Sequence, residues 1–384
     1  MSPYDFSRSA PNPGVTCGQR YSAFKIKKGY VTIERSTDPG HNGTVVIDGG
    51  RNTPLPYCGQ TQYAAAAGAR MGIDLNGHSG VTINGMTRSG IVVRGAQNGV
   101  EMEDGAHNTL RNMEVFDNGY ATSNSWGYST DGNGVLIGGE NNVYDRLLVH
   151  DNGQDEMHSD GNGYDESGSA VDNSWLGALR GHPRYRGEPF NDLQVSGHDP
   201  GCTHADGLQI FAPGTKMSTL SFDYDVFGPG VNQGLYPSDS GTGTTFDDVT
   251  IKNSLFLAAA SVNIRTDNRV HGWDLSHDTL IASRGSFEIP GNGVNTMTRV
   301  IKYGGWISSN GGSWDTSRNV WYGGDPLPGA SVHLNPGFRS VPIGKPLALA
   351  ELLAANLSPS GTAIGSPLHS LSDLLAWIDS LNKQ

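Results

Sequence analysis

The chain has 384 residues, enough for one long solenoid or for two compact domains. Its formal net charge is −12, and such a surface repels nucleic acid and anionic membranes, so we expect neither as a partner. No apolar run reaches the roughly 18 residues that a membrane helix needs. Glycine contributes 54 residues, which together with many Asn and Asp predicts numerous tight turns.

Residues 1–24 are predicted to be an irregular lead-in. This stretch has no apolar core of a signal peptide, and we expect a secreted or extracellular protein whose leader has been removed. Cys17 lies here, and a disulfide between Cys17 and Cys58 would staple this end of the fold; Cys202 is then left over.

Short β-strand patterns begin after residue 24, at residues 30–33, 45–48, 81–83 and 91–93. An internal repeat follows, because residues 108–119 match residues 142–153 at an offset of 34, and residues 219–230 form a weaker third copy. Each copy alternates apolar and polar residues and ends in an Asn-Gly or Pro-Gly turn. The longer offset predicts an inserted loop around residues 119–131.

Leu208, Leu235 and Val262 recur at a step of 27 residues, and Ile289 lies on the next step. A fixed period of this size is typical of one unit stacked on copies of itself. Single short strands without intervening helices predict an all-β fold, a single-stranded right-handed parallel β-helix over residues 25–340. Helical spacing in residues 347–355 and 370–381 predicts a C-terminal helical cap over residues 341–384.

Side-chain alternation along each strand predicts which residues face outward. If Leu208 points into the core, then Gln209, Tyr236 and Asn263 form one outer column, with coils spaced by about 4.8 Å. Such a face can stack on sugar rings and hydrogen-bond their hydroxyls, although it could also be an ordinary solvated sheet face. Arg265 is expected in the next column, with Phe211 and Ser238. The candidate substrate-binding residues here are Gln209, Phe211, Gln233, Ser238, Asp239, Asn263 and Asp267.

A His-x-Asp-Gly motif occurs twice, at residues 158–161 and 204–207. A carboxylate and an imidazole at a strand entry can provide general acid–base chemistry, which makes His158, Asp160, His204 and Asp206 candidates. The alternative is structural, since Asp before Gly often caps a turn.

Between the two motifs lies a long irregular stretch, residues 161–203. A loop of this length is commonly functional. Trp175, Arg180 and Arg184 could wall a cleft and bind carboxylate or sulfate groups, although the stretch could also be a plain insertion. We expect a site without cofactor, and the alternative is Ca²⁺ held by nearby acidic residues, which are Asp155, Glu156, Asp160 and Asp165.

At these residues the chain resembles the pectin-lyase-like superfamily of right-handed β-helix proteins, which includes pectate and alginate lyases and polygalacturonases. Residues 206–208, 230–236 and 262–267 are similar in order to the polygalacturonase motifs. The resemblance implies that Asp206 matches a catalytic aspartate and Arg265 a substrate-binding arginine. Three features depart from that pattern: residues 232–234 read Asn-Gln-Gly in place of Gly-His-Gly, residues 264–266 read Ile-Arg-Thr in place of Arg-Ile-Lys, and the Asp-Asp pair is missing.

The sequence therefore predicts an enzyme that cleaves a polysaccharide, most simply a lyase acting on a uronic-acid-containing glycan. In a lyase, Arg265, His204 or Tyr236 would remove the C5 proton. A glycoside hydrolase is the alternative, with Asp206 paired with Asp160, Asp165 or Asp239. A non-catalytic glycan-binding solenoid and an epimerase also remain open, and a monomer or small homo-oligomer is expected.

Overall fold

The computed structural model describes residues 22–49, 69, 71–87, 89–96, 98–102, 104–116, 118, 133–150, 152, 162–164, 170–172, 207–211, 216–228, 233–238, 245–257, 262–266, 270–281, 285–289, 294–309, 313–322, 324–327 and 330–333. Within these ranges every regular element is a β-strand, and no helix there is long and apolar enough to cross a membrane.

One sheet contains nine strands, all paired in parallel. In spatial order they are β1 (Ser22–Lys25), β4 (Met71–Asp74), β7 (Asn98–Met102), β10 (Val135–Ile137), β15 (Leu208–Phe211), β18 (Gln233–Ser238), β21 (Val262–Ile264), β25 (Gly285–Ile289) and β28 (Trp306–Ser309).

The second sheet contains 19 strands in two parallel rows. The first row is β2 (Thr32–Glu34), β5 (Thr82–Asn84), β8 (Thr109–Arg111), β11 (Val143–Asp145), β16 (Lys216–Asp223), β19 (Thr245–Lys252), β22 (Val270–His271), β23 (Asp274–Ser276), β26 (Val294–Thr298), β29 (Ser313–Tyr322) and β30 (Ala330–His333). The second row is β3 (Val45–Asp48), β6 (Ile91–Arg94), β9 (Met113–Val115), β12 (Leu148–Val149), β17 (Val226–Phe227), β20 (Leu255–Leu257), β24 (Thr279–Ile281) and β27 (Ile301–Tyr303). The long strand β29 pairs with both rows.

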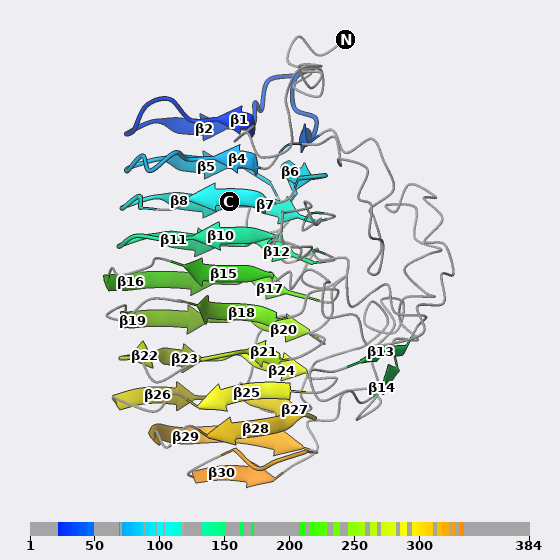
Figure 1. The fold of residues 1–384 in the computed structure, drawn as a ribbon, viewed down its shortest axis with the longest axis vertical. Coiled ribbons are helices and arrows are strands. Elements are labelled where there is room, and N and C mark those ends of the chain that lie inside the picture. The colour runs from blue at the N-terminus through cyan, green and yellow to red at the C-terminus, as the bar shows by residue number, and fades with distance from the viewer. Residues whose placement is uncertain are drawn as a thin grey trace, which may run out of the picture.

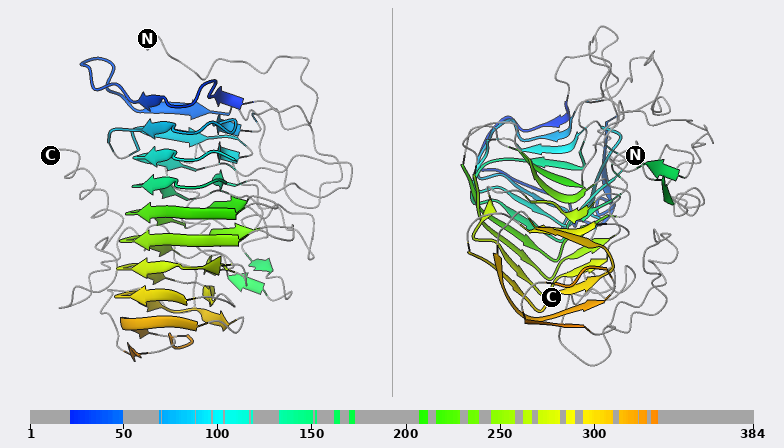
Figure 2. Two further views of the ribbon diagram at one scale, coloured as in Figure 1. Left: turned by 90° about the vertical axis from the view of Figure 1, so that its left-hand side faces the viewer. Right: turned by 60° about the horizontal axis from the view of Figure 1, so that its bottom comes forward.

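Each coil visits the nine-stranded sheet, then the first row, then the second row, and returns to the nine-stranded sheet one layer on (Figure 1). The views in Figure 2 show successive coils stacked on one another from the blue to the orange end. Parallel strands joined in this way make a right-handed parallel β-helix, because parallel crossovers are right-handed. The predicted fold class is confirmed. A separate antiparallel pair joins β13 (Asn162–Tyr164) and β14 (Ala170–Asp172).

The core is a continuous column of apolar side chains from all three walls. Aromatic rings from neighbouring coils stack inside it, with ring centroids 4.7 Å apart for Tyr144 and Phe222 and 5.1 Å apart for Phe227 and Phe256. A single coil cannot bury such a face alone, so coil stacking and core formation depend on each other.

Asparagine side chains link neighbouring coils and explain the internal repeat. Oδ1 of Asn142 accepts from the backbone N–H of Asn108 at 2.9 Å, and Oδ1 of Asn152 accepts from that of Asn118 at 3.2 Å. Both pairs are 34 residues apart, as the repeat predicted. These buried amides satisfy backbone donors at the turns, which would otherwise cost free energy.

The predicted constant step of 27 residues is wrong beyond Leu235. Leu208 does pair with Leu235, but Leu235 pairs with Ile264 and not with Val262. At the corner between the two rows of the 19-stranded sheet, hydrogen-bonded residues of neighbouring coils are 29 positions apart for Asp225 and Ser254. The next such pair, Ser254 and Asp278, is only 24 positions apart. The number of residues in a coil therefore varies with the length of its turns. Ile289 was predicted to stack on Val262, but it pairs with Ser309 on the next strand and lies outside the column of Leu208 and Leu235.

The strands run from Ser22 to His333. The cysteines, the predicted helical cap and the predicted loop at 119–131 lie outside the described residues and stay predictions. β1 begins inside the stretch that the sequence assigned to the lead-in.

Candidate functional site

A line of side chains runs across the outer face of the nine-stranded sheet, at the position that follows a core residue in each strand. We name this line, Asp74, Glu101, Leu136, Gln209, Tyr236 and Arg265, the outer strip. Strand pairing places the first five in register from β4 to β18. Arg265 continues the line, because its backbone N–H donates to the carbonyl of Leu235 at 3.0 Å and Ile264 pairs with Leu235. The core residues Ile73, Val100, Leu235 and Ile264 turn the opposite way.

Tyr236 and Arg265 form the most distinctive contact of the strip. Cζ of Arg265 lies 4.9 Å from the centroid of the Tyr236 ring. This cation–π contact lays the guanidinium against the ring and limits its orientation. Both side chains are half-buried, so a ligand can reach them while water is partly excluded. The pair offers a fixed cation beside a phenol, a combination suited to binding a carboxylate and transferring a proton close to it.

The other end of the strip is acidic and internally paired. Oδ2 of Asp74 accepts from Ser22 Oγ at 2.9 Å and lies 3.3 Å from Lys25 Nζ. Glu101 accepts from Asn98 Nδ2 at 3.0 Å and is buried. The charge of Asp74 is thus compensated by Lys25 on the neighbouring strand β1, and the strip becomes cationic toward Arg265.

Gln209 lies between these two ends on β15. Its Oε1 accepts from Asn133 Nδ2 at 2.6 Å, while the backbone N–H of Asn133 donates to Asn98 Oδ1 at 3.0 Å. This chain of amides crosses from β7 to β15 over the start of β10. These bonds fix the Gln209 side chain, which is buried. The N–H groups of its amide therefore point in one fixed direction.

The predicted columns are partly confirmed. Gln209 pairs with Tyr236, and Phe211 pairs with Ser238, as predicted. The placement of Asn263 in the Gln209 column is wrong, and so is that of Arg265 in the Phe211 column. The reason is the longer coil between β18 and β21, which shifts the register by two residues and brings Arg265 beside Tyr236.

Two predicted substrate-binding residues are enclosed by the fold. Asn263 and Gln233 both have no exposed surface. Nδ2 of Asn263 donates to the carbonyl of Ile281 at 3.0 Å, and the Gln233 carbonyl accepts from Gly207 N–H at 2.8 Å. Both residues are therefore buried in the folded coils, and their predicted role in substrate binding stays a prediction.

The remaining predicted site residues lie outside the described residues and stay predictions. The second His-x-Asp-Gly motif ends at Gly207, which directly precedes β15. In the sequence, the motif therefore ends two residues before Gln209, the strip residue of that strand. Among the described residues no group of three His, Cys, Asp or Glu side chains could hold a metal ion. The residues outside are His158, Asp160, His204, Asp206, Asp239, Asp267, Trp175, Arg180 and Arg184, with the metal candidates Asp155, Glu156 and Asp165.

A buried acid–imidazole pair on the outer face of the second row was not predicted from the sequence. Nε2 of His150 lies 3.1 Å from Oε1 of Glu114, and both side chains are buried. The His150 ring stacks on Phe116, with centroids 5.4 Å apart. The internal repeat already aligned Phe116 with His150, and His150 comes just before the long stretch that separates β12 from β15. That alignment was the available signal for the pair.

Comparisons with known proteins find no family and several distant likenesses. No protein-family model matches the chain, and no curated protein matches it. XylC in complex with xylose aligns at TM-score 0.34 and 7% identity over 67% of this chain, which spans 39% of the length of XylC. An alginate lyase from Paenibacillus sp. str. FPU-7 aligns at TM-score 0.31 and 9% identity, over 82% of this chain and 86% of that one. The mannuronan C-5 epimerase AlgE4 A-module from Azotobacter vinelandii aligns at TM-score 0.29 and 10% identity, over 82% and 79%.

These likenesses concern the fold alone. The β-helix itself rests on the strand pairing described above, and the chemistry of this chain has to be argued from its own residues.

Proposed function

We propose that this chain is a polysaccharide lyase that cleaves a uronic-acid-containing glycan by β-elimination on the outer strip. The observation that carries the proposal is the contact between Tyr236 and Arg265, which puts a phenol and a guanidinium side by side on an outward sheet face. Gln209, one coil away in the same column, adds an oriented amide for a sugar hydroxyl.

The reaction needs two functions at one sugar. The C5 proton of a uronate becomes acidic only when the neighbouring carboxylate is neutralised, and a base must then remove it. The C5–H electrons form the C4–C5 double bond, the C4–O4 bond breaks, and a proton goes to O4. The products are a 4,5-unsaturated uronate and a new chain end, so no water or cofactor is consumed.

Arg265 is suited to the first function. A guanidinium binds a carboxylate through two parallel hydrogen bonds, and the Tyr236 ring restricts the plane in which it can do so. A uronate held in this way lies over the neighbouring rungs of the strip, with its ring toward Tyr236.

Tyr236 is suited to the second function. As phenolate its Oη can take the C5 proton, and as phenol it can return that proton to O4 when both atoms lie on the same side of the sugar. A positioned acid–base group of this kind typically contributes about 10²–10⁴-fold to the rate. His204 and Asp206, at the entry to β15, are the further candidates to share the proton transfer.

The test is an assay of the whole chain on a panel of uronate-containing and neutral polysaccharides. Ultraviolet absorbance of the unsaturated uronate and the appearance of reducing ends are followed together. The proposal predicts that both rise on at least one polyuronate and that neither rises on neutral glycans. Reducing ends without the absorbance would mean hydrolysis, and binding without either product would mean a glycan-binding solenoid; both results contradict the proposal.

Two variants then test the residues. Tyr236→Phe should lower kcat by about 10²-fold or more while keeping substrate binding, because only the hydroxyl is lost. Arg265→Ala should lower kcat/KM and should make the enzyme less selective for uronates over neutral sugars. Arg94→Ala is the matched control, since Arg94 is a half-buried arginine of the second sheet that pairs with Asp48 at 3.0 Å. Equal losses in Arg94→Ala and Arg265→Ala would show that the effect is structural.

A further inference from the structure

A second line of polar side chains runs along the corner between the two rows of the 19-stranded sheet. From the coil of β8 to that of β29, one residue in each coil adopts the left-handed backbone conformation there, with φ between 54° and 60°. From Asn112 to Arg299, each of these residues donates a backbone hydrogen bond to the next coil, as the N–H of His277 does to the Thr298 carbonyl at 3.1 Å. We name these residues the corner ridge: Asn112, Arg146, Tyr224, Asn253, His277, Arg299 and Arg318.

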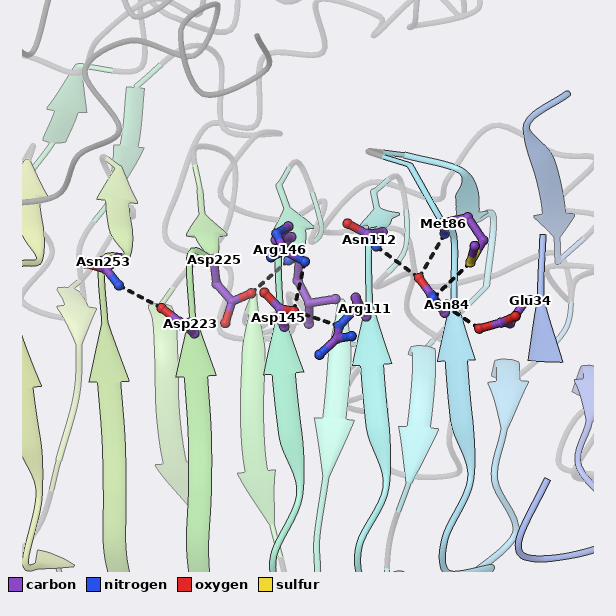
Figure 3. Close-up of polar contacts among 11 residues, drawn as sticks. Glu34, Asn84, Met86, Arg111, Asn112, Asp145, Arg146, Asp223, Asp225 and Asn253 are labelled. Atoms are coloured by element: carbon purple, nitrogen blue, oxygen red, sulfur yellow. Dashed lines mark hydrogen bonds and ion pairs between the residues drawn. The ribbon is translucent and has the colours of Figure 1, made fainter. Parts of the chain in front are cut away.

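The first half of the ridge neutralises its own charges, as Figure 3 shows. Asp145 lies 2.7 Å from Arg111 Nε and 3.0 Å from Arg146 Nη1, so one carboxylate serves two guanidiniums. One coil on, Asp223 accepts from Asn253 Nδ2 at 2.9 Å. Cations in this half therefore have acidic partners within the protein.

The second half of the ridge lacks this compensation. The ridge residues His277, Arg299 and Arg318 follow one another over three coils, and Lys252 lies one coil before them, just ahead of the ridge residue Asn253. None of these four forms an ion pair with a carboxylate among the described residues. Instead Arg299 Nη1 lies 3.0 Å from His277 Nε2. Burial lowers the pKa of His277, and the nearby charges of Arg299 and Lys252 lower it further. The neutral imidazole of His277 is therefore favoured, and the positive charges of this half are those of Lys252, Arg299 and Arg318, on a protein whose net charge is −12.

The backbone conformation of the ridge residues also points to a function for these cations. A left-handed conformation costs free energy for a residue with a Cβ, and Asn tolerates it better than Arg. Asn does occupy the ridge at Asn112 and Asn253, so the position accepts the less costly residue. Arg299 and Arg318 put a long cation there, and strained conformations of this kind are typical of functional positions.

Hydroxyl groups lie directly beside these cations. Ser276, Thr298 and Ser317 pair in register, each just before a ridge residue. Thr298 Oγ1 and Ser317 Oγ lie 3.4 Å apart. The coils of His277, Arg299 and Arg318 therefore each place a ring nitrogen or a guanidinium beside a hydroxyl, and Lys252 continues the hydroxyl column one coil before, at about the 4.8 Å spacing of parallel strands. A polymer with regularly spaced anionic groups could contact several of these side chains at once, whereas a single small anion would contact only one or two of them.

We propose that Lys252, His277, Arg299 and Arg318 bind the carboxylates of a polyuronate chain, as a second glycan site separate from the outer strip. The choice of a polyuronate rests on the proposed function, and the anion-binding character rests on the ridge itself. A site of this kind would hold the polymer while another segment of it is processed, which raises the effective concentration of substrate.

The experiment measures binding rather than turnover. Fluorescently labelled decamers of galacturonate and of mannuronate are titrated into the full chain carrying Tyr236→Phe and Arg265→Ala, so that the outer strip neither cleaves the uronate nor holds its carboxylate, with a xylose decamer as neutral control. Arg299→Asn/Arg318→Asn removes both cations with a residue that keeps the left-handed backbone. Arg146→Asn is the matched control, because it makes the same change on the same ridge where the cation is already paired.

We expect the double variant to weaken binding of a uronate decamer at least tenfold and to reduce its salt dependence, and the control to change it less than twofold. The xylose decamer should not respond. Equal binding by the double variant and the control would overturn the proposal, as would failure of both uronate decamers to bind. An oligodeoxynucleotide that binds the ridge more tightly than either uronate would overturn the choice of ligand. Because no product is measured, a failure of the proposed lyase activity would leave these outcomes readable.

A second readout is specific to the ridge. The charged groups that act on His277 are Lys252 and Arg299 on the neighbouring coils. Asp274, three residues before His277 in the chain, accepts from the Thr296 hydroxyl at 2.6 Å. A bound carboxylate should raise the pKa of His277, measured from its imidazole NMR signal and assigned with His277→Asn. An unchanged pKa under saturating uronate decamer would contradict the proposal.

Discussion

Replacing Asp278 with Asn should stabilise this protein at neutral pH. Asp278 is fully buried at the corner behind the ridge. Its Oδ1 accepts from the backbone N–H of Ser254 at 2.8 Å, and its Oδ2 has no hydrogen-bond partner. Burial raises the pKa of this carboxyl well above its usual range, and the charges of Asp274 and Asp223 add to the rise. The fold therefore selects the protonated form.

The size of the effect follows from these contacts. Keeping a carboxyl of ordinary pKa neutral at pH 7 costs at most about 4 kcal/mol, from 1.36 kcal/mol per pH unit. A buried unpaired oxygen costs about 1–3 kcal/mol. Asn319 shows what an amide does at the equivalent position, since its Oδ1 accepts from Val300 N–H at 2.8 Å and its Nδ2 donates to the Met297 carbonyl at 3.0 Å. We expect Asp278→Asn to add about 1–4 kcal/mol to the free energy of unfolding at pH 7.

The sign of the pH dependence is fixed by the direction of the pKa shift. The folded pKa of Asp278 is raised above the unfolded one, so its contribution is fully present below the unfolded pKa near 4 and is lost as pH rises toward the folded pKa. The Asn variant does not titrate. The advantage of Asp278→Asn should therefore be small at pH 4 and should grow toward neutral pH, as measured by urea unfolding at several pH values.

Asp315→Asn is the control for this series, because Asp315 is exposed on β29 and should change stability by less than about 0.5 kcal/mol. A gain that is independent of pH would refute the reasoning, because it would not come from protonation. A loss of stability at pH 7 would refute it more strongly, since it would mean that the carboxyl has a partner that Asn cannot replace.

Three further changes test the fold and the site. Leu235→Ala should cost about 2–5 kcal/mol in urea unfolding, because Leu235 is fully buried in the shared core. Gly234→Ala should also destabilise, since a Cβ there would lie 2.5 Å from the Asn263 carbonyl oxygen; an unchanged melting temperature would contradict that close approach. Asp206→Asn should abolish polyuronate cleavage while leaving the circular dichroism spectrum and melting temperature unchanged, and full activity would place the chemistry elsewhere.

Much of the fold was predictable because its signals are local. Alternation in each strand placed Leu208 and Ile210 in the core and Gln209 outside, and the 34-residue repeat gave the spacing at which Asn108 and Asn142 meet, although not the role of their amides. The face of the sheet to which a side chain points depends only on the alternation of side chains along its strand. The stacking of Gln209 on Tyr236 followed because that coil has the predicted length.

Register in the later coils was not predictable, because it depends on turn length. Rungs at the corner are 29 residues apart at Asp225 and Ser254 but only 19 apart at Val300 and Asn319. A change of two residues was enough to exchange Asn263 for Arg265 beside Tyr236.

The pair of Glu114 and His150 was missed for a different reason. The two residues are 36 positions apart, two more than the repeat offset, so they meet diagonally across neighbouring coils and not at matching positions of the repeat. The corner ridge escaped notice too, since its residues share a backbone conformation and no common side chain.

The most direct test of the account is a double-mutant cycle of Tyr236→Phe and Arg265→Ala, with kcat/KM measured from the unsaturated product of a polyuronate. The account holds that both side chains act on one sugar, so each single change should cost about 10²-fold or more and the double change clearly less than the product of the two. Strictly multiplicative losses would contradict it, and so would a single variant that keeps wild-type activity.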